Sequence, residues 1–391
     1  MGVAKLYPPY MLYVIEKSYM NRERFTIIYH IVGEEALALE KAKILCLEQT
    51  VEVGDELVPD GFIRDHIIGQ LAHFSRLANQ RYEAQISYDI DTSAFELTQL
   101  LNVIFGNSSL KAGIKVHDLN LGEGILSHFR GPRFGIAGLR KRVGIFDKPL
   151  LCTALKPMGK SPTEIAQLAY DFALGGVDII KDDHGLTNQP FCPYEERVKA
   201  CAEAVAKANE KTGKNGIYVP NITAPTTEIR QRVEYAKRQG AGGLLIAPGL
   251  TGFDTMRALA EEETVNLPLI SHPAFLGSMV TSPENGFSHG VLFGQLQRLA
   301  GADASIYPNY GGRFGFLREE CRSIAESCQD KMGDYAPIFP TPGGGMRLEG
   351  VPDMLALYGN DVIFLIGGAL YSRSMDLVEN TRYFLSLVGR Q

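Results

Sequence analysis

The chain has 391 residues, of which 45% are hydrophobic, and its formal net charge is −6. A chain of this length exceeds one ordinary compact domain unless that domain is a large barrel. The acidic balance excludes the basic footprint of a nucleic-acid-binding protein and the polybasic tract of a membrane-surface protein. The longest apolar runs have the length of a strand, so no transmembrane helix is predicted, and residues 1–20 lack the pattern of a signal peptide.

Residues 1–135 are predicted to form a small α+β domain of ferredoxin-like type. Residues 24–33 read as a strand and residues 34–50 as a helix with regularly spaced apolar positions. A strand around residues 80–91, a helix within 93–107 and a strand within 113–121 follow. The segment 128–149 joins this domain to the rest of the chain.

Residues 136–391 are predicted to form a (β/α)₈ barrel. Eight apolar runs of strand length alternate with eight helical segments, from LLCTALKP at 150–157 to DVIFLIGG at 361–368. Near-continuous apolar strands are typical of a parallel sheet buried on both faces. The alternative is an open doubly wound sheet, but KPMGKSP after the first strand lacks the glycine-rich fingerprint of that fold.

The second barrel strand, in GGVDIIKDDHG at 175–185, ends in a cluster of ionisable residues. Charged groups at the end of a buried strand are costly unless they are used. Lys181 and Asp183 are two positions apart, so both are expected to point into the barrel mouth, with His184 following.

Other strand ends add residues to the same face, where barrel enzymes have their active sites. A lone lysine at a strand end is usually solvated, a lone histidine is usually a packed core residue, and glycine pairs are often only turns. The coincidence of all of them at one face favours a site. The candidates are Lys156, Asn221, His272 and Arg313, with Gly343, Gly344, Gly367 and Gly368 on the last two strands.

This set of residues indicates two kinds of chemistry. Burial favours the neutral amine of Lys181, which could form a Schiff base with a carbonyl substrate or take up carbon dioxide as a carbamate. A carbamate, Asp183 and His184 together would hold a divalent ion. The glycines would let the backbone approach a phosphate closely, so a phosphorylated substrate is expected.

The run GGVDIIKDDH…NQPFCPYEERV resembles the signature of the ribulose bisphosphate carboxylase (RuBisCO) large chain, and PLLCTALKP and IFLIGG resemble its first and last barrel strands. The resemblance covers nearly the whole chain. KDDH, together with SHPAFLGSMVTSP and LAGADASIYPN, is more similar to the RuBisCO-like proteins of form IV than to true carboxylases.

The resemblance implies a role for each candidate residue. Lys181 matches the carbamylated lysine that binds Mg²⁺ and can act as the enolising base, and Asp183 and His184 match its two companion ligands. Lys156 matches a lysine that moves protons near the substrate carbonyl, and His272 matches a substrate-binding histidine. Arg313 lies close to the position at which the family has the lysine of its mobile sixth loop. Glu48 and Thr50 match a segment that completes the site of a second subunit, which implies a homodimer.

Several positions depart from the carboxylase pattern. Met158 stands where carboxylases have a second lysine, Phe95 where they have an asparagine, and Pro273 where an arginine holds a phosphate. His184 replaces a glutamate, which removes a negative charge and leaves room for another divalent metal. Neither a bisphosphate substrate nor carbon dioxide fixation is therefore expected.

The resemblance implies metal-assisted enolisation of a phosphorylated ketose, such as isomerisation of 5-methylthioribulose 1-phosphate, by a cytoplasmic enzyme. The six scattered cysteines, without C-x-x-C spacing, fit reduced thiols in that compartment. Decarboxylation of a phosphorylated β-keto sugar acid, of the 3-oxo-isoapionate 4-phosphate type, uses the same residues and is the first alternative. A Schiff-base aldolase and a non-catalytic ligand-binding protein are further alternatives.

Overall fold

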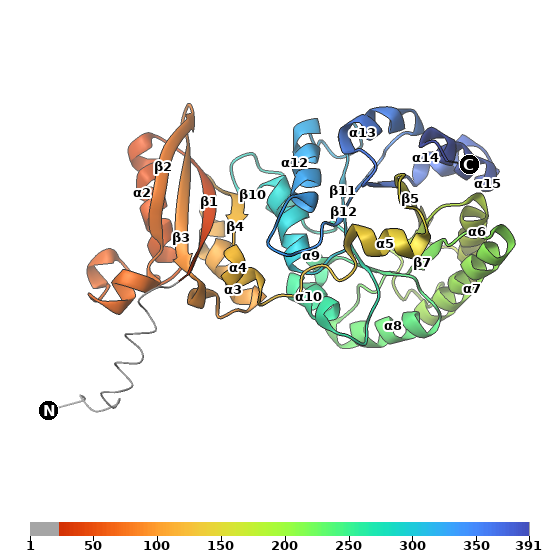
Figure 1. The fold of residues 1–391 in the computed structure, drawn as a ribbon, viewed down its shortest axis with the longest axis horizontal. Coiled ribbons are helices and arrows are strands. Elements are labelled where there is room, and N and C mark those ends of the chain that lie inside the picture. The colour runs from red at the N-terminus through yellow and green to blue at the C-terminus, as the bar shows by residue number, and fades with distance from the viewer. Residues whose placement is uncertain (1–22, 391) are drawn as a thin grey trace. The chain divides into compact units, whose positions relative to one another are not determined.

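The computed structural model describes residues 23–390. The predicted absence of a signal peptide concerns residues 1–20, which lie outside the described range. Internal contacts divide the chain into two compact units, one up to His128 and one from Phe129, whereas the sequence places this boundary after residue 135. Figure 1 shows an antiparallel sheet in the first unit and parallel strands surrounded by helices in the second. Within residues 23–390, no helix combines the length and the apolar composition needed to cross a lipid bilayer.

The first unit is ferredoxin-like, as the sequence predicts, and has βαββαβ topology, although its second strand was not among the predicted elements. Its strands pair antiparallel in the order β4-β1-β3-β2, which is typical of this fold. The main elements are β1 (Arg24–Val32), α2 (Glu35–Glu48), β2 (Gln70–Ala78), β3 (Arg81–Asp89), α3 (Leu97–Phe105) and β4 (Ile114–Asn120). Short helices lie between them: η1 (Asp55–Leu57), η2 (Ile63–Ile67), η3 (Ile90–Ser93), η4 (Asn107–Leu110) and α4 (Gly122–Leu126).

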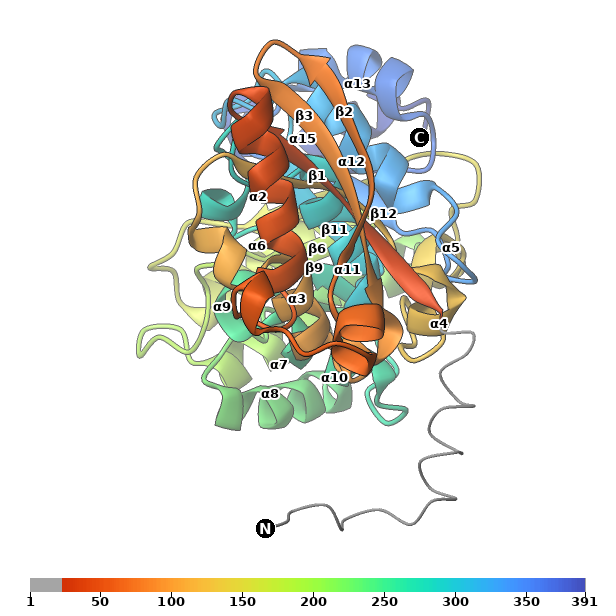
Figure 2. The same cartoon turned by 90° about the vertical axis from the view of Figure 1, so that its left-hand side faces the viewer.

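Apolar alternation builds the core of this unit. In β1 every second residue is buried, including Ile27 and Tyr29, so one face of the sheet is apolar. Ala38, Ala42 and Leu45 of α2 are buried at the spacing of one helix face. Helix α2 lies along this sheet in Figure 2.

The second unit is the predicted barrel. Two four-stranded parallel sheets, β13-β5-β6-β7 and β12-β11-β9-β8, contain all eight predicted strands. An isolated parallel bridge between Asn221 and Leu245 joins the β7 side to β8, and β12 contacts β13. The strands are β5 (Leu150–Leu155), β6 (Ile179–Asp182), β7 (Ile217–Val219), β8 (Leu244–Ile246), β9 (Leu269–Ser271), β11 (Ala304–Pro308), β12 (Phe339–Gly343) and β13 (Ile363–Leu365).

Helices follow each strand of the barrel and lie around its outside in Figure 1. The long ones are α6 (Pro162–Gly175), α7 (Tyr194–Thr212), α8 (Thr226–Arg238), α10 (Phe253–Glu261), α12 (Arg318–Gln329), α13 (Val351–Tyr358) and α15 (Leu377–Leu387). The shorter elements are α9 (Pro248–Thr251), η5 (Gly277–Met279), β10 (Gly286–Phe287), η6 (Val291–Gln295), α11 (Leu296–Leu299), η7 (Leu348–Gly350) and α14 (Gly368–Arg373). Local sequence sets their ends: α6 begins with a capping box of Ser161 and Glu164 and stops at Gly176 in the left-handed conformation.

Helix α5 (Gly135–Val143) closes the amino-terminal end of the barrel. Its apolar residues Ile136, Leu139 and Val143 belong to one buried cluster with the first residues of the strands, among them Leu150 and Ile363. The opposite end of the barrel, where the strands finish, is therefore the end open for a binding site.

Two buried aspartates fasten strands at this closed end. The Oδ2 atom of Asp178 accepts a hydrogen bond from the backbone of Leu151 (2.8 Å), and Arg390 forms an ion pair with the same carboxylate. The Oδ2 atom of Asp303 accepts a hydrogen bond from Leu269 (2.9 Å), and its Oδ1 atom accepts two from the start of α5. Burial raises the pKa of Asp303 to about 6, although these hydrogen bonds oppose the shift.

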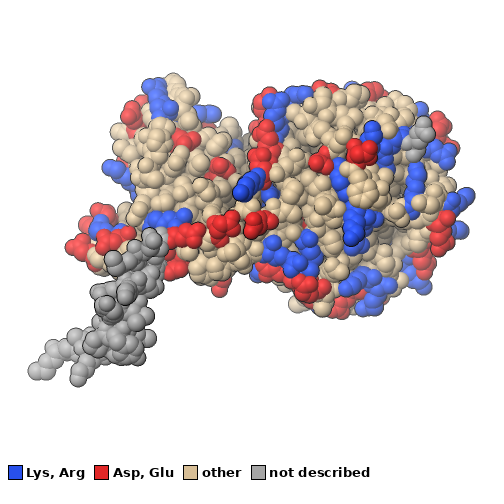
Figure 3. Space-filling model, in the orientation of Figure 1, with Lys and Arg blue, Asp and Glu red and all other residues tan. Residues whose placement is uncertain are grey.

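The surface carries both signs of charge. On the face shown in Figure 3, the described lysine and arginine side chains lie among aspartate and glutamate side chains without forming a continuous basic area. Several of these side chains form exposed ion pairs, such as Arg230 with Glu234. Exposed ion pairs contribute little to stability individually.

We expect the stability difference between the wild-type protein and Asp303→Asn to narrow as the pH rises from 5 to 7.5. The folded state holds the proton of Asp303 more tightly than the unfolded state does. The contribution of protonated Asp303 to the free energy of unfolding is therefore fully present below about pH 4 and is lost as the pH rises through about 6. Urea unfolding of both proteins at the two pH values measures the difference. Asp147→Asn, at an exposed position, is the control; a difference that widens with pH would contradict the assignment.

Candidate active site

A cavity of about 1060 Å³ lies at the carboxyl ends of the barrel strands. Its lining combines ionisable side chains, glycines and a set of apolar residues that includes Val280, Phe293 and Phe316. Nine of the residues predicted from the sequence line it: Lys156, Lys181, Asp183, His184, His272, Arg313, Gly344, Gly367 and Gly368.

Lys181 is the most deeply buried basic group in the lining. It lies on β6, 1% of its surface is exposed, and its Nζ atom donates a hydrogen bond to the backbone carbonyl of Asp182 (3.1 Å). Among the described residues it forms no ion pair. Burial lowers the pKa of Lys181, with the nearby Cys152 and Asp183 opposing the shift. The shift is in the direction that nucleophilic or carbamate chemistry requires, because both need the neutral amine.

Asp183 connects the residues at the ends of the first two barrel strands. Its Oδ1 atom lies 3.1 Å from Nζ of Lys156 and 3.5 Å from Nδ1 of His184. Burial by itself would raise the pKa of Asp183, but the hydrogen bond from His184 and the positive charges of Lys181 and Lys156 outweigh it and lower the pKa. Asp183 is therefore anionic at neutral pH.

The two histidines of the cavity stack on each other. The rings of His184 and His272 lie 4.2 Å apart with an interplanar angle of 14°. The Nδ1 atom of His272 accepts a hydrogen bond from the backbone of Ala274 (3.2 Å), and burial, helped by the charges of Lys181 and His184, lowers the pKa of His272 well below its usual value. His272 is thus neutral, with the proton on Nε2, where it can donate to a substrate oxygen.

These residues fit a divalent ion only if Lys181 takes part. No group of three or more histidine, cysteine, aspartate and glutamate side chains within residues 23–390 is arranged to hold a metal. Asp183 and His184 supply two donors, and an amine becomes an oxygen donor when it is carbamylated. The deep burial of Lys181 beside these two residues fits that chemistry.

The ends of β12 and β13 bring glycines to the cavity, and two arginines join them: Arg313 from the loop after β11 and Arg347 from the segment after β12. Gly344 has a φ of 82°, and a Cβ atom there would lie 2.8 Å from the Phe314 ring, so only glycine fits. Arg313 donates its backbone N–H to the carbonyl of Gly344 (3.0 Å). Arg347 also lines the cavity, and within the part of the chain that the structure describes neither guanidinium has a carboxylate partner. This combination suits an anionic group.

Arg347 was not among the residues predicted from the sequence. It comes two positions after the glycine run, in GGGMR, and that proximity was the available signal. Pro273, which stands where the carboxylases have an arginine, also lines the cavity. The cavity therefore has an arginine at position 347 that was not predicted, and it lacks the arginine that the carboxylases have at the position of Pro273.

Two predicted phosphate-binding residues do not line the cavity. Gly343 lies inside β12, where an added Cβ atom would approach the Leu365 side chain to 3.0 Å, so its smallness serves packing. The Nδ2 atom of Asn221 donates to the backbone carbonyls of His184 (2.9 Å) and Leu186 (3.1 Å). Its position favours holding the loop after β6 over direct contact with a substrate.

Glu48 and Thr50 lie in the first unit, at the end of α2. Glu48 pairs with Lys111, and the Oγ1 atom of Thr50 donates to the carbonyl of Cys46 (2.9 Å). Both side chains therefore have partners inside their own domain, and their role in a second subunit stays a prediction.

Comparisons with known proteins agree with this architecture. The family model of the ribulose bisphosphate carboxylase large chain, catalytic domain, matches residues 135–379. The 5-methylthioribulose-1-phosphate isomerase of Rhodospirillum rubrum is 37% identical over 368 residues, which cover 94% of this chain and 96% of that protein. The 2,3-diketo-5-methylthiopentyl-1-phosphate enolase of Bacillus pumilus is 33% identical over 318 residues, 81% of this chain and 78% of that protein.

A solved structure extends the likeness to three dimensions. The Rubisco-like protein from Rhodopseudomonas palustris superposes with a TM-score of 0.86 at 36% sequence identity, covering 94% of this chain and 98% of that chain. A ferredoxin-like domain followed by a (β/α)₈ barrel defines the class of protein. The chain belongs to the ribulose bisphosphate carboxylase large-chain family, which confirms the resemblance carried by the KDDH run and the predicted fold.

We expect Lys181→Met to leave the stability of the metal-free protein unchanged or to raise it by up to about 2 kcal/mol. A buried amine without an ion-pair partner costs free energy, and an apolar side chain of similar length removes that cost. Urea unfolding measures the change, with Lys199→Met at an exposed position as the control. A loss above about 1 kcal/mol would mean that Lys181 has a structural role.

Proposed function

We propose that this protein is an enzyme that enolises a phosphorylated ketose with the help of a divalent metal. The observation that carries the proposal is the placement of a buried lysine, an ionised aspartate and a histidine at one strand end, facing a cavity with a glycine-lined anion site. Two similar proteins are named as an isomerase and an enolase of methylthio-pentulose phosphate compounds. Isomerisation of 5-methylthioribulose 1-phosphate is therefore the first candidate reaction.

Enzymes of this family use Mg²⁺ and a carbamylated lysine, and we propose that carbamylated Lys181, Asp183 and His184 hold such an ion here. When bound, the ion polarises the substrate carbonyl and stabilises the enediolate. Lys181 is placed to take the proton α to that carbonyl. His272 donates its Nε2–H to a substrate oxygen, and the amino group of Lys156, partly exposed and paired with Asp183, supplies a proton of its own to the enediolate.

The substrate phosphate is proposed to bind at the ends of β12 and β13. Gly367 and Gly368 line the cavity and have open space where a Cβ atom would lie. Arg313 and Arg347 supply the positive charge for this group. The apolar lining elsewhere, including Ile306 and Phe316, suits a substrate end that carries no second phosphate.

These features support enolisation over carboxylation. Pro273 cannot hold a second phosphate as an arginine would, and Met158 is half exposed where carboxylases have a lysine. Decarboxylation of a phosphorylated β-keto sugar acid passes through the same type of enediolate, so it remains the second candidate reaction.

We further propose that the protein acts in the cytoplasm as a homodimer in which Glu48 and Thr50 of one subunit complete the site of the other. All six cysteines are buried and unpaired, which suits a reducing compartment. Two copies related by a two-fold axis would share both sites equally.

The test of this function is deuterium exchange. In D₂O with Mg²⁺ and bicarbonate, we expect the protein to place deuterium at the carbon α to the carbonyl of 5-methylthioribulose 1-phosphate, as NMR detects. Lys181→Ala should lower the rate by about 100-fold or more, because the base is lost, while Lys199→Ala should keep it.

Other outcomes would identify a different reaction. Release of carbon dioxide from a phosphorylated β-keto sugar acid, with deuterium in the product, would establish the decarboxylase. Borohydride-dependent attachment of substrate to Lys181 or Lys156 would establish a Schiff-base aldolase. No exchange with any ketose phosphate by a folded, metal-loaded protein would contradict the proposed enzyme.

We expect Gly368→Ala to raise the KM for the substrate by about 10-fold or more without lowering the thermal stability. Its added methyl group meets no atom within 4 Å, so the fold accepts it, but the methyl group would occupy space that the phosphate needs. Steady-state kinetics and thermal unfolding measure the two effects. The matched control is Gly350→Ala, which lies outside the cavity lining, has a φ of −78° and would bring its added Cβ atom within 4 Å of Met354 alone.

A further inference from the structure

The loop of residues 183–193, between β6 and α7, carries two of the proposed metal ligands but has no regular secondary structure. Some of its bonds are internal: Gln189 accepts from the backbone of Thr187 (2.9 Å) and donates to the carbonyl of Gly185 (2.7 Å). These local bonds shape the loop but do not attach it to the barrel. Its position must therefore depend on residues outside it.

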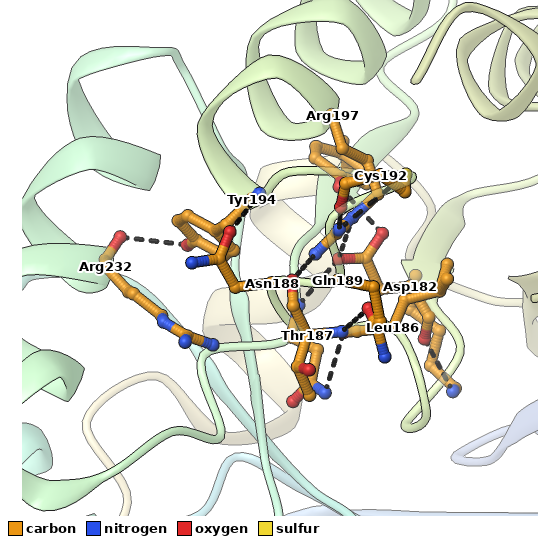
Figure 4. Close-up of polar contacts among 12 residues, drawn as sticks. Asp182, Leu186, Thr187, Asn188, Gln189, Cys192, Tyr194, Arg197 and Arg232 are labelled. Atoms are coloured by element: carbon orange, nitrogen blue, oxygen red, sulfur yellow. Dashed lines mark hydrogen bonds and ion pairs between the residues drawn. The ribbon is translucent and has the colours of Figure 1, made fainter. Parts of the chain in front are cut away.

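Arg197 of α7 makes the main attachment. Its side chain is fully buried and forms an ion pair with Asp182, Nε to Oδ2 at 3.2 Å. Its Nη1 and Nη2 atoms donate to the backbone carbonyls of Cys192 (3.0 Å) and Thr187 (2.7 Å). Figure 4 shows these contacts converging on the guanidinium from the strand end and from both parts of the loop.

Asp182 extends the same network toward the next strand. Its carboxylate accepts hydrogen bonds from the Tyr218 hydroxyl (2.8 Å) and the Asn221 backbone N–H (3.0 Å). The Asn221 side chain then donates to the carbonyl of His184 itself. Because Asp182 lies between Lys181 and Asp183 in the sequence, the strand end and the loop are fixed by the same buried carboxylate.

An arginine suits this position for a geometric reason. Its planar guanidinium presents donors in several fixed directions, and here they reach three acceptors, one at the end of β6 and two in the 183–193 loop. A lysine has one donor atom and could not replace all three contacts.

We propose that Arg197 is a positioning residue for the metal ligands: it fixes the path of residues 183–193, so that Asp183 and His184 reach the cavity already oriented. This inference rests on the proposed metal site. Arg197 contacts neither the substrate nor the ion, and it acts through Asp182 and the loop carbonyls. Residues that orient ligands in this way strongly affect metal affinity.

The matched control is Arg232 of α8. It is also largely buried, at 7% exposure, and its guanidinium lies over the same Tyr194 ring as that of Arg197, at 5.2 Å compared with 5.6 Å. Its hydrogen bonds go to Thr223 and Glu228 and none reaches the 183–193 loop. Arg232→Lys therefore disturbs a similar buried environment without detaching the loop.

The first measurement is hydrogen–deuterium exchange of the full chain without metal. We expect Arg197→Lys to speed the exchange of peptides covering residues 183–193 by about 10-fold or more, and Arg232→Lys to leave it at the wild-type rate. Where Arg197→Lys fails to fold, Asn221→Ala removes the bonds to His184 and Leu186 and keeps the ion pair, and faster exchange of the same peptides is expected. Wild-type exchange in these variants would overturn the proposal.

The second measurement is Mn²⁺ binding to the bicarbonate-treated protein, followed by the EPR signal of the free ion. We expect Arg197→Lys to weaken binding about 10–100-fold and Arg232→Lys to bind as the wild-type protein does. Equal weakening by both variants would show a general loss of structure and would contradict a specific positioning role. A different outcome would be faster loop exchange in Arg197→Lys together with a wild-type protein that binds no Mn²⁺. It would establish the positioning of the loop by Arg197 and contradict the metal-dependent function instead.

Discussion

The alternation of side chains along β6 is the constraint on which the site depends. Lys181 and Asp183 face the cavity, whereas Asp182, between them, faces the layer of helices and binds Arg197. A shift of one residue in this strand would exchange the two sets. Three consecutive ionisable residues can therefore serve two purposes only because the strand pairs in one register with β5 and β7.

The two sides of this strand differ in how well their charges are satisfied. Asp182 and Arg197 are both fully buried, and the carboxylate has three donors. Lys181 is as deeply buried but has one backbone acceptor. The well-paired side stabilises the framework, and the poorly paired side leaves a buried amine with few partners. Such a division is typical of sites that sacrifice stability for activity.

Periodicity within short segments was enough to predict the eight barrel units and most of the first domain, because apolar spacing is a local property. It missed β2, whose residues are mostly exposed and show no regular alternation. It also placed the side chains of Lys181, Asp183 and His272 correctly at strand ends. It could not assign the partners of Asn221 or the importance of Arg197, because these bonds join residues 37 and 15 positions apart.

The aspartates at the closed end of the barrel show an internal symmetry. Asp178 at the start of β6 donates its N–H to Leu151 of the preceding strand, accepts from the same residue through Oδ2, and accepts through its carbonyl from Ile217 of the next strand. Asp303 at the start of β11 repeats all three bonds with Leu269 and Phe339. β6 and β11 are the second and sixth barrel strands, so the same pattern of bonds recurs four strands apart at this end. The candidate site lies at the other end, where the two strands differ: β6 leads into the KDDH cluster, whereas β11 leads into the loop of Arg313.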